Sequence, residues 1–152
     1  MSSLVTVGWR EWLAFPDLGL PAVRAKIDTG ARTSALHARD IEHVSESHVR
    51  FVVDPLLRGQ TLAITCQAPV VDEREVTSSS GHAELRVVVR VTLRLGVQSD
   101  APQWPVEVTL TDRRQMRFPM LLGREAMTGR VVVDSGGSYL LGRPDDPSAF
   151  YD

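Results

Sequence analysis

The chain has 152 residues, 43% of them hydrophobic and 24% charged, which suits one globular domain with a sizeable core. Its formal net charge of -2 provides no electrostatic reason to expect nucleic acid or an anionic membrane as the main partner. The single cysteine, Cys66, excludes a disulfide within the chain and disfavours a zinc site built on thiolates. The first residues lack the features of a signal peptide, and no apolar run approaches the roughly 18 residues of a membrane span, so we expect a cytoplasmic protein.

Short strands separated by turns dominate the predicted secondary structure. Apolar and polar residues alternate in 23–27, 85–95 and 104–110, and this period of two indicates half-buried antiparallel strands. The apolar run 131–133 is typical of a short core strand, and only 124–128 has a helical pattern. Glycine and proline recur between these segments and mark turns. The whole pattern predicts an all-β barrel or sandwich.

The chemistry is expected at Asp28-Thr29-Gly30, where an apolar strand runs directly into a tight loop. Gly30 is expected to adopt backbone angles closed to other residues and to let a backbone N–H approach the Asp28 carboxylate. The Thr29 hydroxyl is expected to lock the loop by hydrogen bonding. Such a loop presents a carboxylate that is rigidly held yet open to solvent. A bare Asp-Thr-Gly often marks only a turn, so the rest of the chain has to decide.

A second segment, Phe-Pro-Met-Leu-Leu-Gly-Arg at residues 118–124, lies far downstream of the Asp28 loop. Together the two segments resemble the retropepsin family. Its members pair an apolar-Asp-Thr-Gly-Ala loop with a later apolar-apolar-Gly-Arg segment that crosses beside the loop and leads into a short helix. Leu121, Leu122, Gly123 and Arg124 match that later segment. The resemblance implies an all-β, retropepsin-like acid protease barrel with one short helix after Leu-Leu-Gly-Arg, and a catalytic role for Asp28, Thr29 and Gly30.

A third feature is the polar stretch 73–85, whose strand-like flanks surround a tip at Ser79, Ser80 and Gly81. It resembles the flap hairpin that closes over substrate in retropepsins, and a polar, flexible tip is what a lid requires. The resemblance implies that Ser79, Ser80 and Gly81 contact substrate. An ordinary exposed hairpin is the alternative interpretation.

The resemblance narrows to a bacterial group that has carried the label ATP-dependent zinc protease and is now grouped with retropepsin-like peptidases. It rests on 26–37, on the flap-like tip and on 112–124, and it covers about residues 5–141. Members are often associated with ATP-grasp ligases that add glutamates, which implies such a ligase as a partner and an acidic, glutamate-tailed chain as substrate. We expect one retropepsin-like domain over 1–142 and a loosely held tail over 143–152.

An aspartic peptidase needs two carboxylates that share one proton, because like charges this close cannot both ionise. The chain offers one good loop aspartate, so we expect a homodimer in which each copy supplies its Asp28. Asp134, in Asp-Ser-Gly, is a rival within the chain. The Leu-Leu-Gly at 140–142 follows it too soon to close a separate lobe, so a turn at a strand end is the preferred interpretation.

Three arginines are candidates for substrate binding, because a guanidinium can clamp a carboxylate with two hydrogen bonds. Arg32 follows the Asp28 loop directly, and Arg113 and Arg124 flank the second segment. Structural ion pairs with Asp112 or Glu125 are the alternative.

No metal or cofactor is expected. The four histidines contain no His-Glu-x-x-His, and there is no Gly-rich phosphate loop that would bind ATP. Cys66 lies in a strand-like run and is interpreted as a small buried hydrophobe. The competing function is a non-catalytic module that binds a peptide or partner in association with an ATP-grasp ligase.

Overall fold

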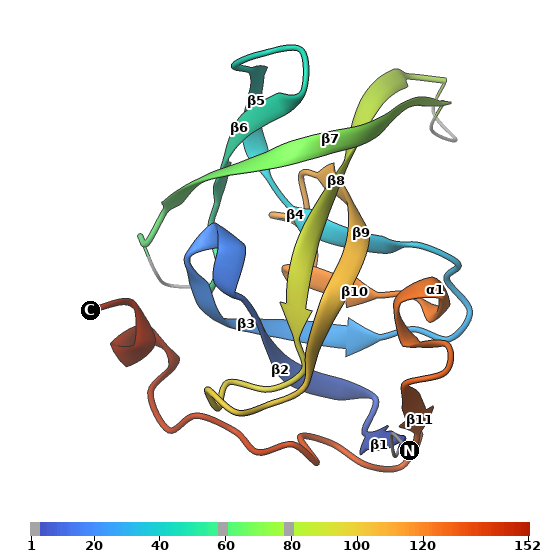
Figure 1. Cartoon of the computed structure of the whole chain (residues 1–152), viewed down its shortest axis with the longest axis vertical. Coiled ribbons are helices and arrows are strands. Elements are labelled where there is room, and N and C mark those ends of the chain that lie inside the picture. Colours follow the sequence, from blue (N-terminus) through green and yellow to red (C-terminus); the bar gives the residue numbers. More distant parts are fainter. Residues whose placement is uncertain (1–3, 58–60, 78–80) are drawn as a thin grey trace.

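The computed structural model describes residues 4–57, 61–77 and 81–152, and β-strands make up most of it (Figure 1). The only α-helix among these residues is α1 (Arg124–Met127), and two 3-10 turns are η1 (Pro16–Leu18) and η2 (Pro147–Tyr151). The predicted all-β fold, with one short helix at the end of the Leu-Leu-Gly-Arg segment, is confirmed. The strands are β1 (Val5–Val7), β2 (Arg10–Phe15), β3 (Leu20–Ile27), β4 (Ser34–His37), β5 (Arg39–His43), β6 (His48–Val53), β7 (Ile64–Thr77), β8 (Ala83–Arg94), β9 (Gln103–Thr111), β10 (Met120–Leu122) and β11 (Val131–Val133).

The large sheet closes on itself to form a barrel. Its strand order is β2-β3-β10-β4-β9-β8-β7-β6-β5, and β2 also pairs with β8 through Ala14 and Arg94. This extra pairing joins the two ends of the run from β2 to β8, while β7, β6 and β5 continue the sheet beyond the ring (Figure 1). The short strands β1 and β11 pair in parallel as a separate two-stranded ribbon. Closure removes most free strand edges, which would otherwise invite pairing with other chains.

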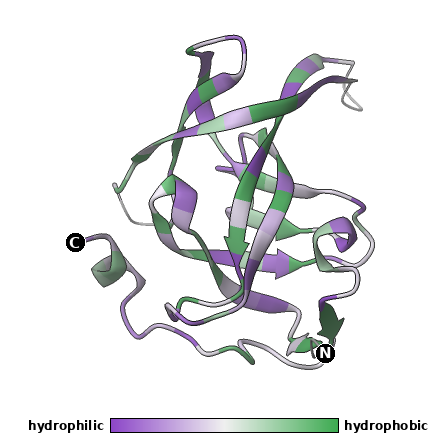
Figure 2. Cartoon of the chain, in the orientation of Figure 1, coloured by the Kyte–Doolittle hydropathy of each residue, from purple (hydrophilic) through white to green (hydrophobic). Residues whose placement is uncertain are grey.

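Alternate residues of the barrel strands fill the core. Exposed and buried positions alternate along most of β9, and the hydropathy colours show the same alternation on the ribbon (Figure 2). Burying one side chain of this size contributes about 1.5–3 kcal/mol, so this shared core holds the strands that carry the loops. The fully buried apolar residues include Leu13, Phe15, Leu20, Leu36, Val89, Leu93, Val108, Leu110, Met120 and Leu122.

β10 lies between β3 and β4, and this arrangement positions the Asp28 loop. It runs parallel to β3, with Leu122 beside Ile27, and antiparallel to β4, with Leu121 beside Ala35. The chain therefore leaves β3, turns through residues 28–33 and returns as β4 on the other side of the same short strand. The predicted crossing of the Leu-Leu-Gly-Arg segment beside the Asp28 loop is confirmed.

A buried carboxylate ties the two ends of the chain together. Glu11 on β2 is fully buried and accepts hydrogen bonds from the backbone N–H groups of Gly8 (2.7 Å), Leu140 (2.9 Å) and Leu141 (3.1 Å). At Gly8 the backbones meet so closely that a Cβ atom would lie 2.3 Å from the Gly137 carbonyl oxygen. Three backbone donors satisfy the acceptor positions that burial would otherwise leave empty.

The tail after residue 142 makes specific contacts. Tyr151 in η2 donates its hydroxyl hydrogen to the Ala22 carbonyl oxygen of β3, and Asp146 caps the turn by accepting from Ser148. How loosely residues 143–152 are held stays a prediction. None of the helices in the described ranges is long and apolar enough to cross a membrane.

We predict that Glu11→Gln lowers the free energy of unfolding by about 2 kcal/mol, because the amide NH2 would face at least one buried backbone donor. Urea unfolding followed by tryptophan fluorescence measures the change. Glu46→Gln is the matched control, since Glu46 is exposed and should leave the midpoint unchanged. Equal midpoints for Glu11→Gln and the wild-type chain would show that the buried carboxylate does not hold the chain ends.

Candidate active site

Asp28 stands at the end of β3 and is held by backbone groups. Its own N–H donates to the Leu122 carbonyl oxygen (2.9 Å), and its Oδ1 accepts from the N–H groups of Gly30 (3.0 Å) and Ala31 (3.2 Å). No described residue bonds Oδ2, and Asp28 is half-buried beside the exposed Thr29 and Gly30. One oxygen of the carboxylate is therefore fixed while the other remains open for chemistry.

The structure corrects two details of the predicted loop. Gly30 is not in the left-handed region, so the prediction that it needs angles closed to other residues is wrong. A Cβ atom there would lie 3.3 Å from Asp28 Oδ1, so close approach of the backbone is what favours glycine. The predicted lock through Thr29 is also wrong within one chain, because its exposed hydroxyl bonds no other described residue.

Gly123 packs directly against the backbone of residues 31–33 in the Asp28 loop. A Cβ atom at Gly123 would lie 2.3 Å from the Thr33 carbonyl oxygen and 3.0 Å from that of Ala31. The Gly123 N–H donates to the buried Ser34 hydroxyl at 2.9 Å. No larger residue fits at this crossing without displacing the loop.

The first turn of α1 is bonded to the same loop. The backbone N–H groups of Arg124 and Glu125 donate to the carbonyl oxygens of Ala31 (2.8 Å) and Arg32 (3.1 Å). The Arg32 side chain also pairs with Glu125, with Nε to Oε1 at 2.7 Å. Both ends of the loop are thus anchored, at Leu122 and at the start of α1.

We predict that Gly123→Ala destabilises the chain by about 2 kcal/mol or more, because the added methyl group overlaps a backbone carbonyl. Thermal unfolding measures the loss. Gly136→Ala is the matched control in the Asp134 loop, where the nearest atom to a new Cβ is Asp134 Oδ1 at an ordinary 3.6 Å. If both variants unfold at the wild-type temperature, the crossing at Gly123 is not tightly packed.

The three predicted arginines have different surroundings. Arg32 and Glu125 form an ion pair whose side chains are 75% and 55% exposed, and Arg124 is exposed with only backbone bonds. Arg113 is 9% exposed, and its Nε donates to the Phe118 carbonyl oxygen at 3.1 Å. Burial without a carboxylate lowers the pKa of Arg113. Arg32 and Arg124 therefore flank the Asp28 loop, whereas Arg113 has a structural position.

A buried histidine marks the opposite end of β4 from the Asp28 loop. His37 Nδ1 accepts from the Arg113 backbone N–H at 3.0 Å, so its proton is on Nε2, which donates to Asp54 at 2.7 Å. Arg39 donates two further hydrogen bonds to Asp54 and, as the largest cause, holds the pKa of that carboxyl below its usual value. Arg113 contacts His37 at the end of β4, whereas Gly123 contacts Ser34 at its start. Because a four-residue strand spans about 10 Å, the two contacts are about that far apart.

The flap-like hairpin consists of β7 and β8, which pair antiparallel from Val70 and Val89 up to Thr77 and Ala83. It projects from the barrel toward the side of the view on which α1 lies (Figure 1). Gly81 is exposed and has a φ of 87°, which favours glycine. Ser79 and Ser80 lie outside the described residues, so their predicted contact with substrate stays a prediction.

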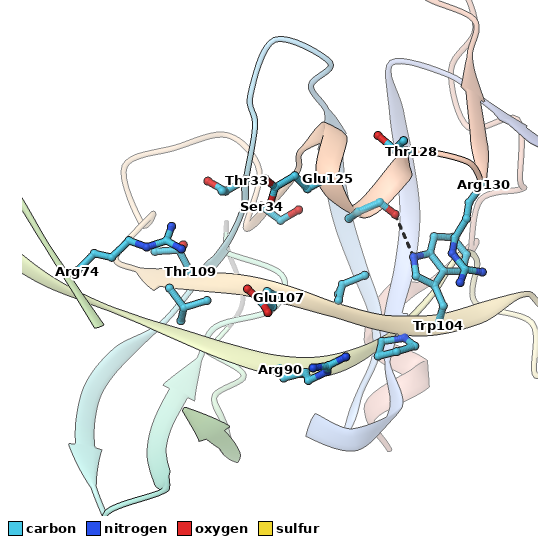
Figure 3. A pocket seen from close by; sticks show the side chains of 14 residues that line it. Thr33, Ser34, Arg74, Arg90, Trp104, Glu107, Thr109, Glu125, Thr128 and Arg130 are labelled. Atoms are coloured by element: carbon cyan, nitrogen blue, oxygen red, sulfur yellow. Dashed lines mark hydrogen bonds between the residues drawn. The ribbon is translucent and has the colours of Figure 1, made fainter. Parts of the chain in front are cut away.

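A hollow of about 320 Å³ lies between the end of the Asp28 loop and strand β9 (Figure 3). Thr33, Ser34 and Glu125 line it from the loop and α1, opposite Trp104 and Glu107 of β9. The Trp104 indole N–H donates to the Ala126 carbonyl oxygen at 3.0 Å, which joins α1 to the barrel. Charges of both signs line the hollow, so it favours no single class of ligand.

Neither a metal centre nor a thiol nucleophile is found in the described part of the chain. No group of three or more His, Cys, Asp or Glu side chains there could hold a metal ion. Cys66 is buried, as predicted, and burial raises the pKa of its thiol to about 12. Asp134 Oδ1 accepts from the Gly136 N–H at 3.1 Å, and the Asp134 N–H donates to the Val7 carbonyl oxygen of β1 at 2.8 Å. β1 pairs with β11 alone, however, whereas β10 pairs with the strands on both sides of the Asp28 loop.

Comparison with protein families agrees with this geometry. The RimB-like model, described as retropepsin-like aspartic endopeptidase RimB, matches residues 6–144. This chain belongs to the RimB-like family. The retropepsin-like fold expected from the Asp28 loop and the Leu-Leu-Gly-Arg segment is therefore confirmed.

Curated relatives of this RimB-like chain are longer proteins. A "Probable alpha-L-glutamate ligase" of Parasynechococcus marenigrum (strain WH8102) is 44% identical over 156 residues, which cover 99% of this chain and 33% of the relative. One with the same name in Shewanella pealeana is 41% identical over 143 residues, covering 92% of this chain and 30% of the relative. The chain thus spans about a third of the length of these relatives.

A solved structure resembles the RimB-like chain over nearly its whole length. It is the crystal structure of a protein of unknown function from Legionella pneumophila subsp. pneumophila str. Philadelphia 1. The two share 26% sequence identity with a TM-score of 0.74, and the match covers 91% of this chain and 99% of the other. The two proteins thus share their overall fold over nearly the same extent.

Proposed function

We propose that this RimB-like chain is half of an aspartic peptidase in which Asp28 supplies one catalytic carboxylate and a second copy supplies the other. The observation that carries the proposal is the asymmetry of the Asp28 carboxylate. Two backbone N–H groups hold Oδ1, while Oδ2 has no partner among the described residues. A carboxylate held in this way keeps its orientation and still exchanges protons with water and substrate.

The proposed reaction uses the two carboxylates as one acid–base pair. Since Oδ1 accepts from Gly30 and Ala31, the single shared proton resides on the open oxygens, which face each other across a two-fold axis. The ionised carboxylate takes a proton from water as the water oxygen attacks the peptide carbonyl carbon. The neutral partner gives its proton to the carbonyl oxygen. The carboxyl group that took the proton from water then gives it to the amide nitrogen, and the other carboxylate takes a proton back from a hydroxyl of the tetrahedral intermediate. The C–N bond breaks, which releases a carboxylic acid and an amine and restores the dyad.

The proposed homodimer places the exposed loop against its own copy. Thr29 and Gly30 are exposed in the single chain, which suits a surface that a second copy covers. Val132 of the nearby β1–β11 ribbon (46%) and Leu4 just before β1 (52%) are exposed, and pairing would remove these apolar side chains from water. Ile27 donates its N–H to the Trp9 carbonyl oxygen, so the ribbon and the Asp28 loop are joined through residues 8–9.

We predict that Asp28→Asn lowers the cleavage rate about 10²–10⁴-fold, because an amide cannot exchange the proton. Mass spectrometry of glutamate-rich peptides incubated with each chain measures the rate. Asp134→Asn is the matched control, since it changes the other Asp-x-Gly loop and should cleave at the wild-type rate. Circular dichroism should give the same unfolding temperature for all three chains. Cleavage that survives Asp28→Asn would contradict the proposal.

We propose that the substrate is an acidic, glutamate-rich or glutamate-tailed chain and that the protein associates with an ATP-grasp ligase. The support is that relatives named as alpha-L-glutamate ligases contain a region of 41–44% identity to this chain within about a third of their length. The same observation favours a second candidate, a non-catalytic module that binds a peptide or the ligase. Cleavage distinguishes the two candidate functions. A peptidase cuts a glutamate-rich peptide and loses this activity in Asp28→Asn, whereas a binding module cuts no peptide and is unaffected by the substitution.

A further inference from the structure

Eleven of the fifteen described arginines fall into two groups according to what their guanidinium groups contact. Six have a carboxylate oxygen within 4.0 Å, so a nearby acid offsets their charge. Five others have no carboxylate within that distance and lie over aromatic rings. The six are Arg32, Arg39, Arg50, Arg74, Arg86 and Arg114; the five are Arg10, Arg24, Arg117, Arg130 and Arg143.

Contacts with three aromatic rings connect four of these five arginines, here called the cationic strip (Arg10, Arg24, Arg117 and Arg143). The guanidinium carbon of Arg10 lies 4.6 Å from the ring centroids of both Trp9 and Tyr139, and that of Arg143 lies 4.9 Å from Tyr139. Trp9 meets Phe118 edge to face at 6.0 Å, and Arg24 lies 4.7 Å over Phe118. An aromatic face orders a guanidinium without neutralising it, so in-plane N–H donors remain available for an anion.

The cationic strip begins on the face of β3 that also carries Asp28. Side chains alternate along a strand, so Arg24, Lys26 and Asp28 point to one side, and Ala25 and Ile27 are buried on the other. Arg10 on β2 is the cross-strand neighbour of Lys26, so Arg10, Arg24 and Lys26 give this face three cations. Successive positions on this face are about 6.6 Å apart, so Arg24 lies about 13 Å from Asp28.

Two adjoining pockets, of about 370 and 410 Å³, lie beside Arg24 and are lined by arginines of the strip. Trp12, Arg24 and Pro147 line both pockets, Arg117 lines the first and Arg143 the second. Trp12 is 8% exposed, and its indole N–H has no partner among the described residues.

Acidic residues of the tail also reach these pockets. Asp145 lines one and Asp146 the other, and the Asp146 carboxylate accepts from the N–H and the hydroxyl of Ser148. Neither aspartate lies within 4.0 Å of an arginine of the strip. The three arginines therefore leave a positive excess in the pockets.

We infer that the cationic strip, with Lys26, binds an acidic polypeptide segment and leads it along β3 to Asp28; this inference rests on the proposed peptidase function. An extended peptide presents alternate side chains on one side at nearly the spacing of Lys26 and Arg24. Guanidinium groups already cover the faces of Tyr139 and Phe118, so bases of single-stranded nucleic acid would have little to stack on. In a two-fold dimer each copy contributes one strip, one on each side of the scissile bond.

The test measures binding apart from catalysis. Every chain carries Asp28→Asn, and fluorescence anisotropy follows a labelled peptide with glutamate at alternate positions, compared with the same peptide carrying glutamine. We expect Arg24→Gln combined with Arg143→Gln to weaken binding of the glutamate peptide about tenfold or more. Arg50→Gln is the matched control, because Arg50 is exposed on β6 and paired with Glu42, and it should bind as tightly as its parent. Arg143 makes no hydrogen bond to a described residue, so Arg143→Gln alone retains the fold and should give part of the loss.

The outcomes separate this inference from the proposed function. Equal affinity of all variants, or equal affinity for the glutamate and glutamine peptides, overturns the inference. Tighter binding of a single-stranded RNA oligonucleotide than of the glutamate peptide also overturns it. Loss of binding in the double variant supports the role of the strip in binding, whether or not the chain with Asp28 intact cleaves the peptide. Absence of cleavage by that chain would overturn only the peptidase proposal.

Discussion

The whole site depends on the close backbone contact between Gly123 and the loop that follows Asp28. β10 is only three residues long, yet it pairs with β3 on one side and β4 on the other, and the loop joins those two strands. The absence of a side chain at Gly123 lets the carbonyl oxygens of Ala31 and Thr33 approach it. With the loop pressed down in this way, its N–H groups are aimed at one oxygen of Asp28. Preorganisation of this kind is what the proposed acid–base role of Asp28 requires.

The surface around this carboxylate has an uneven distribution of charge, although the chain as a whole carries a net charge of only -2. Acidic neighbours offset arginines such as Arg39 and Arg114. Those beside β2 and β3 instead lie on aromatic rings, which order the side chain and leave its charge free. The protein therefore has a positive electrostatic potential beside β2 and β3 that its net charge does not indicate. A field of this kind attracts acidic chains and becomes weaker as salt is added.

Much of the fold could be predicted from the sequence because its signals are local. Alternation along residues 85–95 and 104–110 specifies strands, and the two glycines at 30 and 123 mark the loop and the crossing. The reason for Gly30 was nonetheless wrong, because approach to the carboxylate rather than a left-handed angle demands glycine there. Lys26 could have been placed beside Asp28 from the same period-two pattern, which puts both on one face of β3.

Contacts between distant segments could not be predicted. Glu11 is buried because N–H groups from residues 8, 140 and 141 converge on it, and nothing near Glu11 in the sequence reports this. Arg113 resembles a substrate ligand by its position near the second segment, but the fold buries it against Phe118. The strip joins Arg10 and Arg24 of the neighbouring strands β2 and β3 to Arg117 and Arg143, which come much later in the chain. A single sequence specifies such groups only through the tertiary packing that unites them.

Two chains are proposed to share one active site, and mixing wild-type subunits with Asp28→Asn subunits tests this sharing. Asp28→Asn chain is added in an equal amount to a fixed amount of wild-type chain, and the subunits are allowed to exchange before the cleavage rate of a glutamate-rich peptide is measured. If each active site needs Asp28 from both chains, only dimers with two wild-type chains cleave, and random pairing lowers the rate to about half. A rate that stays unchanged while mass measurements show complete mixing would mean that each chain acts alone, and would contradict the account.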